Sequence, residues 1–283
     1  MAVRFVIDSA SDILPEEAAA LGLVHLPLKV IFGNEEYADG VDLSHRAFYE
    51  KLVESDVLPT TCQVPPGEFE AVFRALTDSG DTVIAVPLSS RLSGTWQSAA
   101  IAAEAFAEKV FVVDSKSVSI GIRILVLRGL ELAAQGLSAR QIARSLEQER
   151  EHIRLMALVD TLEYLKKGGR ISAATALAGS LLSIKPVIAM EDGAVAMVGK
   201  ARGSRQGNNL LRELVQKCGG IRFEKPFAFA YSGLSDALLR KYIADSSELW
   251  QDCGRPLSVN TVGCAIGTHV GPGAIAVAFF DGG

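Results

Sequence analysis

The feature that most constrains this fold is a regular alternation of short apolar runs with helix-length segments along the first half of the chain. Strands that alternate with helices predict a parallel sheet whose two faces are covered by helices. Ligands of such sheets usually bind beyond the carboxyl ends of the strands. The expected strands cover residues 4–8, 24–32, 81–88 and 109–115. The first expected helix begins between Ser11 and Pro15, three more cover 45–55, 67–76 and 93–106, and the last begins at about Ser119.

The second half of the chain has a different order of elements. Ser138 and Gln141 have the spacing of a capping box, which predicts one more helix that ends the first half near residue 152. The runs at 184–190 and 194–201 flank a short Glu-Asp-Gly turn, which predicts an antiparallel hairpin. The further expected strands cover 154–160, 226–232, 257–264 and 274–280, and the expected helices cover 161–169, 173–182, 208–217 and 236–250. We therefore expect an α/β domain over 1–152 and an α+β domain with a mixed sheet over 153–283.

Composition excludes several classes of protein. A chain of 283 residues is long enough for about two domains, and its net charge of -5 offers no basic face for a polyanion, so we expect no nucleic acid partner. The four cysteines form no C-x-x-C pair, which indicates reduced thiols rather than a zinc or redox site. No signal-peptide pattern opens the sequence, and the apolar stretch 121–137 is interrupted by charges. We expect a cytoplasmic protein.

Several loops at the ends of expected strands are rich in serine and threonine. The hydroxyl-rich loops cover 8–12, 59–69, 89–95 and 113–119. Each precedes a helix, whose first N–H groups lack partners and carry a partial positive charge. Hydroxyls at such a place either cap the helix or help to hold an anion, and capping is the more common role of a single serine. The concentration of these loops at strand ends favours an anion-binding site.

Two stretches of the second half carry further candidate residues. Lys166, Lys167 and Arg170 surround a Gly-Gly turn, where they form either a cationic site or a solvated helix end. His269 lies in a glycine-rich loop before the last strand, where it is either structural or a hydrogen-bond donor or base. The sequence contains no metal-binding, phosphate-loop or nucleophile-elbow motif, since Ser93 with the following glycine supplies only half of the last. We expect no metal, no cofactor and no ATP chemistry within the chain.

These stretches, taken together and in this order, resemble the DegV family of bacterial fatty-acid-binding proteins. The resemblance spans nearly the whole chain and implies an N-terminal three-layer α/β/α domain and a C-terminal two-layer α+β domain that enclose a lipid. It is carried by DSASD (8–12), PTTCQVPPGEF (59–69), SSRLSGTWQSA (89–99), VDSKSVSIG (113–121), LEYLKKGGRIS (162–172), IKPVIAMEDG (184–193), KARG (200–203) and IGTHVGPGAIAVAFF (266–280).

The resemblance also implies a function. It describes a carrier rather than an enzyme, which holds one long-chain fatty acid for a separate ATP-dependent fatty acid kinase subunit that forms the acyl phosphate. Transient membrane contact for lipid exchange is part of this expectation. The family's carboxylate-binding and supporting positions, with the small residues beside them, fall on Thr61, Ser93, Arg170, His269, Cys62 and Gly94.

One further position concerns the partner, and two positions depart from the family pattern. Arg202 matches an arginine that the family uses for docking to the kinase. Cys62 stands where serine is more common, which weakens a hydrogen bond there. Arg91 stands where glycine is common, which alters the loop before Ser93.

Two other functions are compatible with the candidate residues. An acyl or ester hydrolase would use Ser93 as nucleophile and His269 as its base, and would also need a third group that orients the histidine and an oxyanion hole. A binder of a small polar ligand such as a triose would attach its ligand through His269. Fold alone does not decide between these functions and the carrier, and the motifs favour the carrier.

Overall fold

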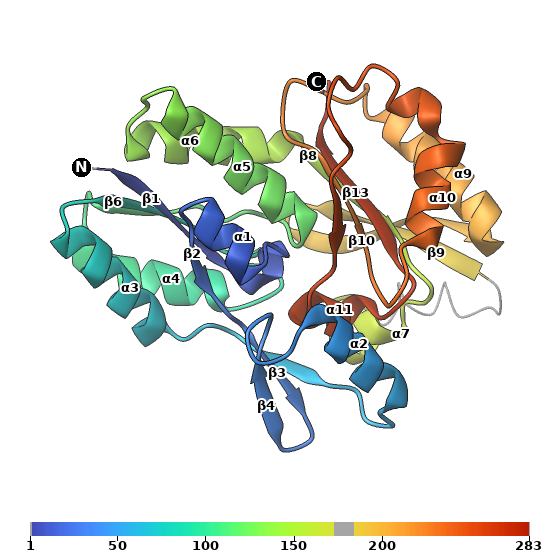
Figure 1. Cartoon of the computed structure of the whole chain (residues 1–283), viewed down its shortest axis with the longest axis horizontal. Coiled ribbons are helices and arrows are strands. Elements are labelled where there is room, and N and C mark those ends of the chain that lie inside the picture. The colour runs from blue at the N-terminus through green and yellow to red at the C-terminus, as the bar shows by residue number, and fades with distance from the viewer. Residues whose placement is uncertain (1, 173–183, 283) are drawn as a thin grey trace.

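The computed structural model describes residues 2–172 and 184–282. Its first half contains the predicted parallel sheet, in the order β2-β1-β6-β7 with every neighbouring pair parallel (Figure 1). Residues 83–86 in the centre of this sheet are fully buried, as expected of a strand covered on both faces. The strands are β1 (Val3–Asp8), β2 (Val24–Leu26), β6 (Thr82–Val86) and β7 (Val110–Val112).

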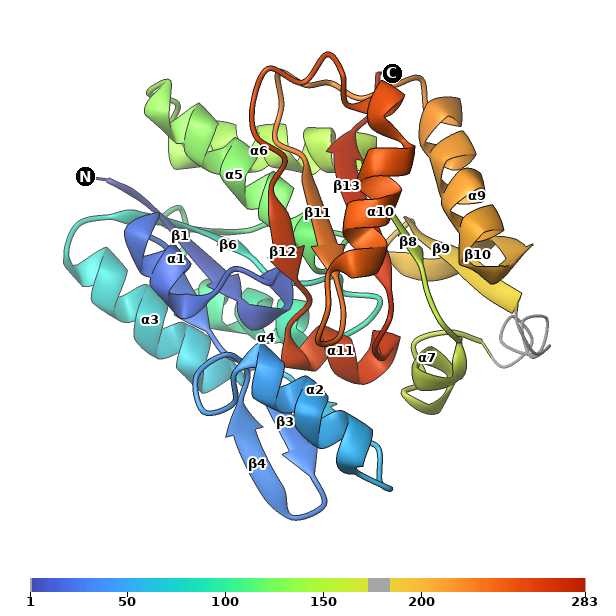
Figure 2. The ribbon, with the colours of Figure 1, turned by 45° about the vertical axis from the view of Figure 1, so that its right-hand side comes forward.

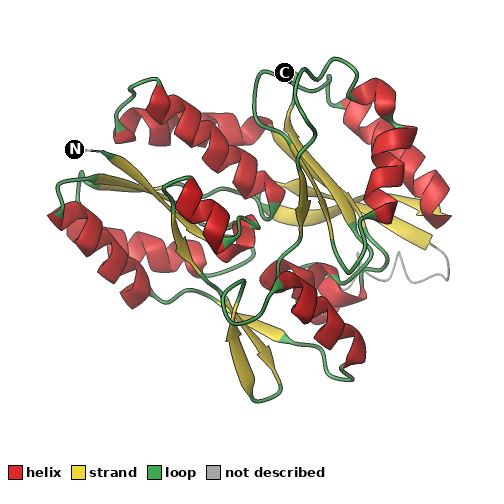
Figure 3. Ribbon diagram, viewed as in Figure 1, coloured by secondary structure: helices red, strands yellow, loops and turns green. Residues whose placement is uncertain are grey.

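Helices cover both faces of the parallel sheet, so the three-layer prediction is confirmed (Figures 1 and 3). One layer consists of α3 (Pro66–Asp78) and α4 (Thr95–Ala103), and the other of α5 (Ile120–Ala134) and α6 (Ala139–Glu149). A short helix, α1 (Pro15–Ala20), packs beside β2. The predicted capping box at the start of α6 is present, with the Ser138 hydroxyl and the Gln141 side chain each accepting from the other's backbone N–H.

The second half forms the predicted mixed sheet, in the order β10-β9-β8-β13-β11-β12. All neighbours are antiparallel except β11 and β12, and β9 and β10 form the expected hairpin. Two helices, α9 (Gly203–Lys217) and α10 (Ala237–Asp245), cover the outer face of the sheet (Figure 2). The strands are β8 (Ile153–Leu158), β9 (Ile184–Glu191), β10 (Ala194–Arg202), β11 (Ala228–Tyr231), β12 (Val259–Thr261) and β13 (Ile275–Phe280).

Helix α5 lies between the two sheets. It contacts β8, β11 and β13 of the mixed sheet, while the ring of Phe5 on β1 fills the space beside Gly129 of the helix. Because apolar neighbours lie on several sides, most residues of α5 are buried, including the whole run 120–126. The domain boundary at 152 falls between this helical layer and β8, and it stays a prediction.

The structure contains a third sheet that the sequence analysis did not predict. The expected strand at 24–32 is two strands, because Pro27 lacks the N–H that a continuous strand needs. The part before it, β2, joins the parallel sheet, and the part after it turns into a separate antiparallel sheet of order β4-β3-β5 (Figure 1). Its strands are β3 (Lys29–Phe32), β4 (Glu35–Ala38) and β5 (Thr60–Cys62).

Several element boundaries differ from the expected ones. Helix α9 begins five residues earlier than expected, at Gly203, and so includes Gly207, where the side chain of Leu158 leaves no room for a Cβ. Helix α10 ends at Asp245, before a 3-10 turn (Ser247–Leu249), and the expected strand at 257–264 is reduced to β12. The expected helix at 173–182 lies outside the described residues.

The glycine-rich segment before the last strand also differs from its prediction. His269 does not lie in a loop but in the last turn of a short helix, α11 (Cys264–Val270). This helix packs against α2 (His45–Glu54) and α7 (Glu163–Lys167), and Figures 1 and 2 show the three together. The second half of the chain thereby contributes a helix to the edge of the first half.

No helix within residues 2–172 or 184–282 combines the length and the apolar character that crossing a bilayer requires.

Candidate ligand-binding site

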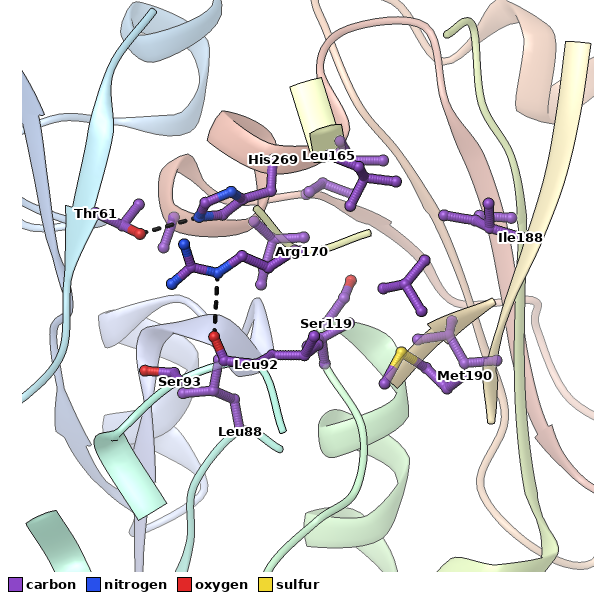
Figure 4. Close-up of a pocket in the computed structure, with 18 of the residues that line it drawn as sticks. Thr61, Leu88, Leu92, Ser93, Ser119, Leu165, Arg170, Ile188, Met190 and His269 are labelled. Atoms are coloured by element: carbon purple, nitrogen blue, oxygen red, sulfur yellow. Dashed lines mark hydrogen bonds between the residues drawn. The ribbon is translucent and has the colours of Figure 1, made fainter. Parts of the chain in front are cut away.

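One large cavity lies where the two halves of the chain meet, and the centre of a water-sized sphere can occupy about 190 Å³ of it (Figure 4). A single water needs roughly 10–15 Å³ on this scale, so the cavity accommodates a far larger molecule. Most of its lining is apolar. Its apolar side chains include Leu28, Leu88, Leu92, Val118, Leu155, Ala157, Leu165, Ile188, Met190, Val195, Ala230, Val262, Ile266, Val270, Ala274 and Ala276.

The floor of the cavity is the inner face of the mixed sheet. Ala230, Ala276 and Ala157 lie directly opposite one another on β11, β13 and β8. Their small side chains leave space above the sheet that larger residues would fill. Ile188 and Met190 of β9 continue this apolar wall, on the side away from Thr61 in Figure 4. An extended hydrocarbon fits such a surface better than a compact polar molecule does.

Thr61 and His269 meet at the opposite end of the cavity. The Thr61 hydroxyl and His269 Nε2 form a hydrogen bond of 3.0 Å that joins β5 to α11. Thr61 was predicted to lie at a loop-to-helix junction, but it lies in β5, paired with Val30 of β3. Burial, assisted by the positive charge of Arg170, lowers the pKa of His269 to about 4. The imidazole is therefore neutral near pH 7.

Arg170 brings a positive charge to the same end of the cavity. It follows α7, and its Nε donates to the Leu92 carbonyl at 3.1 Å while Nη1 donates to the Gly168 carbonyl at 2.6 Å. A guanidinium has five N–H donors, and these contacts use two of them. Lys166 and Lys167, by contrast, are exposed on α7. Of the three predicted cations, Arg170 is the one that lines the cavity.

Ser93 and Gly94 lie at the N-terminus of α4, a helix of nine residues. The Ser93 hydroxyl accepts from the Thr95 N–H at 3.2 Å and shares a hydrogen bond of 3.0 Å with the Thr95 hydroxyl. The free N–H groups and the dipole of α4 favour a negative charge here. A Cβ at Gly94 would overlap the end of the Gln63 side chain, which donates to Ser98 at 2.9 Å, so a larger residue there would displace Gln63.

All six residues predicted to bind the ligand line this one cavity: Thr61, Cys62, Ser93, Gly94, Arg170 and His269. Arg202, the predicted docking residue, is exposed at the junction of β10 and α9 and does not line the cavity. The structure places these residues, and their roles stay predictions.

Two polar residues of the cavity were not predicted, Gln63 and Ser119. Both lie in stretches that carry the family resemblance, Gln63 in 59–69 and Ser119 in 113–121, and this position was the sequence signal that could have identified them. Ser119 begins α5 with a φ of 54°, and its hydroxyl donates to Asp12 Oδ2. Asp12 Oδ1 accepts from the Gly263 N–H at 2.8 Å, so the carboxyl joins α5 to the start of α11. Burial raises the pKa of Asp12 to about 7.

Among the described residues, Ser93 and His269 are not hydrogen-bonded to each other at the polar end of the cavity. The Ser93 hydroxyl is bonded to Thr95 rather than to His269, whose Nε2 is bonded to Thr61. Within the described part of the chain, Nδ1 of His269 has no hydrogen-bond partner, so no carboxyl orients the ring as in a catalytic triad. The described residues also contain no cluster of three or more metal-ligating side chains.

The fold and the cavity together define a class of protein: an α/β chain of two packed halves that encloses a mostly apolar pocket with a cationic, hydroxyl-lined end. The chain belongs to the DegV family, described as a family of uncharacterised proteins, whose sequence model matches residues 2–282. This confirms the resemblance that the motifs indicated.

Individual relatives are similar over their whole length. A DegV domain-containing protein of Deinococcus radiodurans is 37% identical, and the match covers 98% of each chain. The structure of a DegV family protein from Thermus thermophilus that binds fatty acid is 33% identical, with a TM-score of 0.86 over 99% of this chain and 100% of that one. DegV from Bacillus subtilis, a fatty acid binding protein, is 29% identical, with a TM-score of 0.81 over 99% of both chains.

Proposed function

We propose that this protein binds one long-chain fatty acid, with the carboxylate at the polar end of the cavity and the alkyl chain along its apolar wall. The observation that carries the proposal is the shape and chemistry of a single cavity, which is apolar over most of its lining and cationic and hydroxyl-lined at one end. The relatives from Thermus thermophilus and Bacillus subtilis, which bind fatty acids, support the same assignment.

The energetics favour this ligand. Burial of a sixteen-carbon tail contributes about 11 kcal/mol before the costs of association, at about 0.8 kcal/mol per methylene. A carboxylate taken from water needs donors in return. The described contacts of Arg170 use two of its five N–H groups, and Thr61 and Ser93 supply hydroxyls at the same end of the cavity. The neutral imidazole of His269 adds no charge at this end of the cavity and can still form a hydrogen bond.

Native mass spectrometry of the purified protein, followed by solvent extraction and identification of the released molecule, tests the proposal. We expect one fatty acid per chain, either retained through purification or taken up when added. A protein that stays bare with added fatty acid would contradict the proposal. Ester turnover lost in Ser93→Ala would instead support a hydrolase, and a covalent triose adduct on His269 would support a binder of small polar ligands.

We further propose that the loaded protein is a cytoplasmic carrier without a catalytic centre or cofactor of its own, which presents the carboxylate to a separate ATP-dependent kinase subunit for acyl-phosphate formation. Brief membrane contact allows lipid exchange. The exposed position of Arg202, away from the cavity, suits a docking residue.

The docking role is tested by measuring the rate at which a cognate kinase phosphorylates the bound fatty acid, in the wild type and in two arginine variants. Arg202→Ala should retain fatty acid affinity and lower the phosphorylation rate. Arg46→Ala, which removes another exposed arginine on α2, serves as the control. Equal rates for Arg202→Ala and the control would remove Arg202 from the docking surface.

A further inference from the structure

The tip of the β9–β10 hairpin extends beyond the strands that support it. Within the described strands, β9 pairs with β8 along Val187–Ala189, whereas residues 190–195 pair only with each other across the turn. β10 is the edge strand of the sheet. A two-stranded ribbon is marginally stable in water by itself, so the position of this tip depends on contacts outside the sheet.

The tip forms part of the cavity wall. Met190 and Val195 lie opposite each other in the hairpin, and both line the cavity. Figure 4 shows Met190 across the cavity from Thr61 and His269, which belong to the polar end. The hairpin tip therefore closes the cavity at the end where the alkyl chain would terminate.

A buried hydrogen bond holds the turn of the hairpin against the first half of the chain. The Ser89 hydroxyl donates to the Gly193 carbonyl at 2.6 Å, and Ser89 is fully buried. Asp192 and Gly193 have φ values of 45° and 78°, as a tight two-residue hairpin turn requires. A Cβ on Gly193 would lie 2.7 Å from the Ser89 hydroxyl oxygen, so the contact is close enough to need glycine.

Two cations hold the same turn from outside. Lys116 Nζ lies 3.0 Å from one Asp192 carboxylate oxygen, and Arg91 Nη1 lies 3.8 Å from the other. The side chain of Asp192 is 75% exposed, so salt screens these ion pairs strongly. Arg91 is also the residue that departs from the glycine common in the family, so this chain adds a cation at the turn.

The loop that contacts the hairpin also carries the polar end of the cavity. The Ser89 carbonyl accepts from the N–H groups of Leu92 and Ser93, at 3.0 and 3.2 Å. The Leu92 carbonyl in turn accepts from Arg170. One tight turn therefore contacts the polar end of the cavity on one side and the hairpin tip on the other.

We propose that residues 190–195 form a flap over the tail end of the cavity, held closed by the Ser89–Gly193 hydrogen bond and the ion pairs of Asp192, and that its opening sets the rate at which a bound alkyl chain leaves. This inference rests on the proposed fatty acid function. It assigns to Ser89, Arg91, Lys116 and Asp192 a role in ligand retention that is separate from carboxylate binding.

The test is a stopped-flow measurement of release of cis-parinaric acid, a fluorescent fatty acid, from the loaded protein into excess phosphatidylcholine vesicles. Asp192→Asn keeps a residue suited to the positive φ and removes the ion pairs, so release should become about two- to fivefold faster at low salt. In about 1 M salt this difference should disappear. Ser89→Ala should release about tenfold faster at either salt concentration, because the Gly193 carbonyl loses a buried donor.

The matched control is Asp245→Asn, which removes an exposed ion pair with Lys241 on α10, far from the cavity lining, and should leave release unchanged. Amide exchange within residues 190–195 should also rise in Asp192→Asn and Ser89→Ala. If Asp192→Asn and Ser89→Ala both bind the fatty acid and both show the release rate and amide exchange of the wild type, residues 190–195 do not act as a flap. Failure of the wild type to take up parinaric acid would contradict the fatty acid function instead, and amide exchange would still test whether these contacts close the flap.

Discussion

At the scale of single residues, Thr61 and Ser93 are the two hydroxyls whose removal most directly tests the polar end of the cavity. The double variant Thr61→Ala with Ser93→Ala should lower fatty acid affinity at least about 100-fold, since hydrogen bonds to charged groups contribute roughly 1.5–3 kcal/mol each. Isothermal titration or displacement of parinaric acid measures the effect. Thr61→Ser keeps the hydroxyl and should stay close to wild type, and an unchanged double variant with native circular dichroism would contradict the carboxylate assignment.

The sequence predicted the identity of these residues but not their geometry. Hydroxyl-rich loops at strand ends pointed to an anion site because parallel strands end at one edge of a sheet. That rule does not predict the contact between Thr61 and His269, which are 208 residues apart in the chain. The family motifs supplied the set of residues, and only the fold shows that Thr61 holds His269.

At the scale of elements, the end of α7 fixes the position of His269. Gly168 caps the C-terminal end of this helix, and a Cβ there would overlap the imidazole of His269. Gly168→Ala should therefore displace the ring from Thr61 and lower fatty acid affinity about tenfold, as expected for the loss of one positioned hydrogen bond. Its backbone φ is -74°, so alanine adds no backbone strain that would confuse the result.

Gly67→Ala on α3 is the matched control for this prediction, because no atom lies within 4 Å of the added Cβ. Both variants should fold, and only Gly168→Ala should lose affinity. Equal affinities for the two variants, measured by parinaric acid displacement, would show that α7 does not position His269.

The capping box of α6 gives an element-scale prediction about stability. Ser138→Ala removes the hydroxyl that accepts from the Gln141 N–H, so the free energy of unfolding should fall by about 1 kcal/mol. Urea unfolding measures the change. Ser79→Ala, at the C-terminal end of α3, removes a hydroxyl that caps no helix start and should cost less. A Ser138→Ala variant as stable as wild type would show that the box contributes nothing.

The elements also show where sequence patterns stop being informative. Periodicity and capping signals located the helices and the β9–β10 hairpin because those signals are local. The third sheet was missed since β3 pairs with β5, whose three residues, Thr60–Cys62, carry no strand pattern of their own. The early start of α9 was also missed. Gly207 lies inside this helix and packs closely against Leu158, and no local pattern encodes such a contact.

At the scale of the whole molecule, the cavity exists because neither half of the chain encloses it alone. The first half contributes Thr61, Ser93 and Ser119, and the second contributes the alanine floor, Arg170 and His269. A buried polar group also lies at this junction: the Asp12 carboxyl joins α5 to the start of α11. Because this group is ionisable, we expect the stability of the protein to depend on pH.

Buried groups that titrate between pH 4 and 8 determine the direction of that dependence. Among them, burial lowers the pKa of His25 and of His45. Burial raises the pKa of Asp8 and of Asp12 from 3.8 to about 7, and burial lowers the pKa of His269 from 6.5 to about 4. Between pH 4 and 7 the folded protein holds protons on both carboxyls that the unfolded chain has released, so these groups lower stability as the pH rises. His269 acts in the opposite direction between pH 4 and 6.5, because the unfolded chain there binds the extra proton.

The pKa shifts of the two carboxyls are larger than that of His269 and act over the whole range from pH 5 to 7, so we expect the free energy of unfolding to be higher at pH 5 than at pH 8, although His25 and His45 act in the same direction as His269. Urea unfolding of lipid-free protein at constant ionic strength measures this, since a bound ligand would add its own stabilisation. Asp12→Asn removes one of the two raised carboxyls and should flatten the curve between these pH values. A wild-type stability that increases from pH 5 to pH 8 would mean that both carboxyls are already ionised in the folded protein, with their negative charge stabilised by the N–H groups of Leu88 and Gly263.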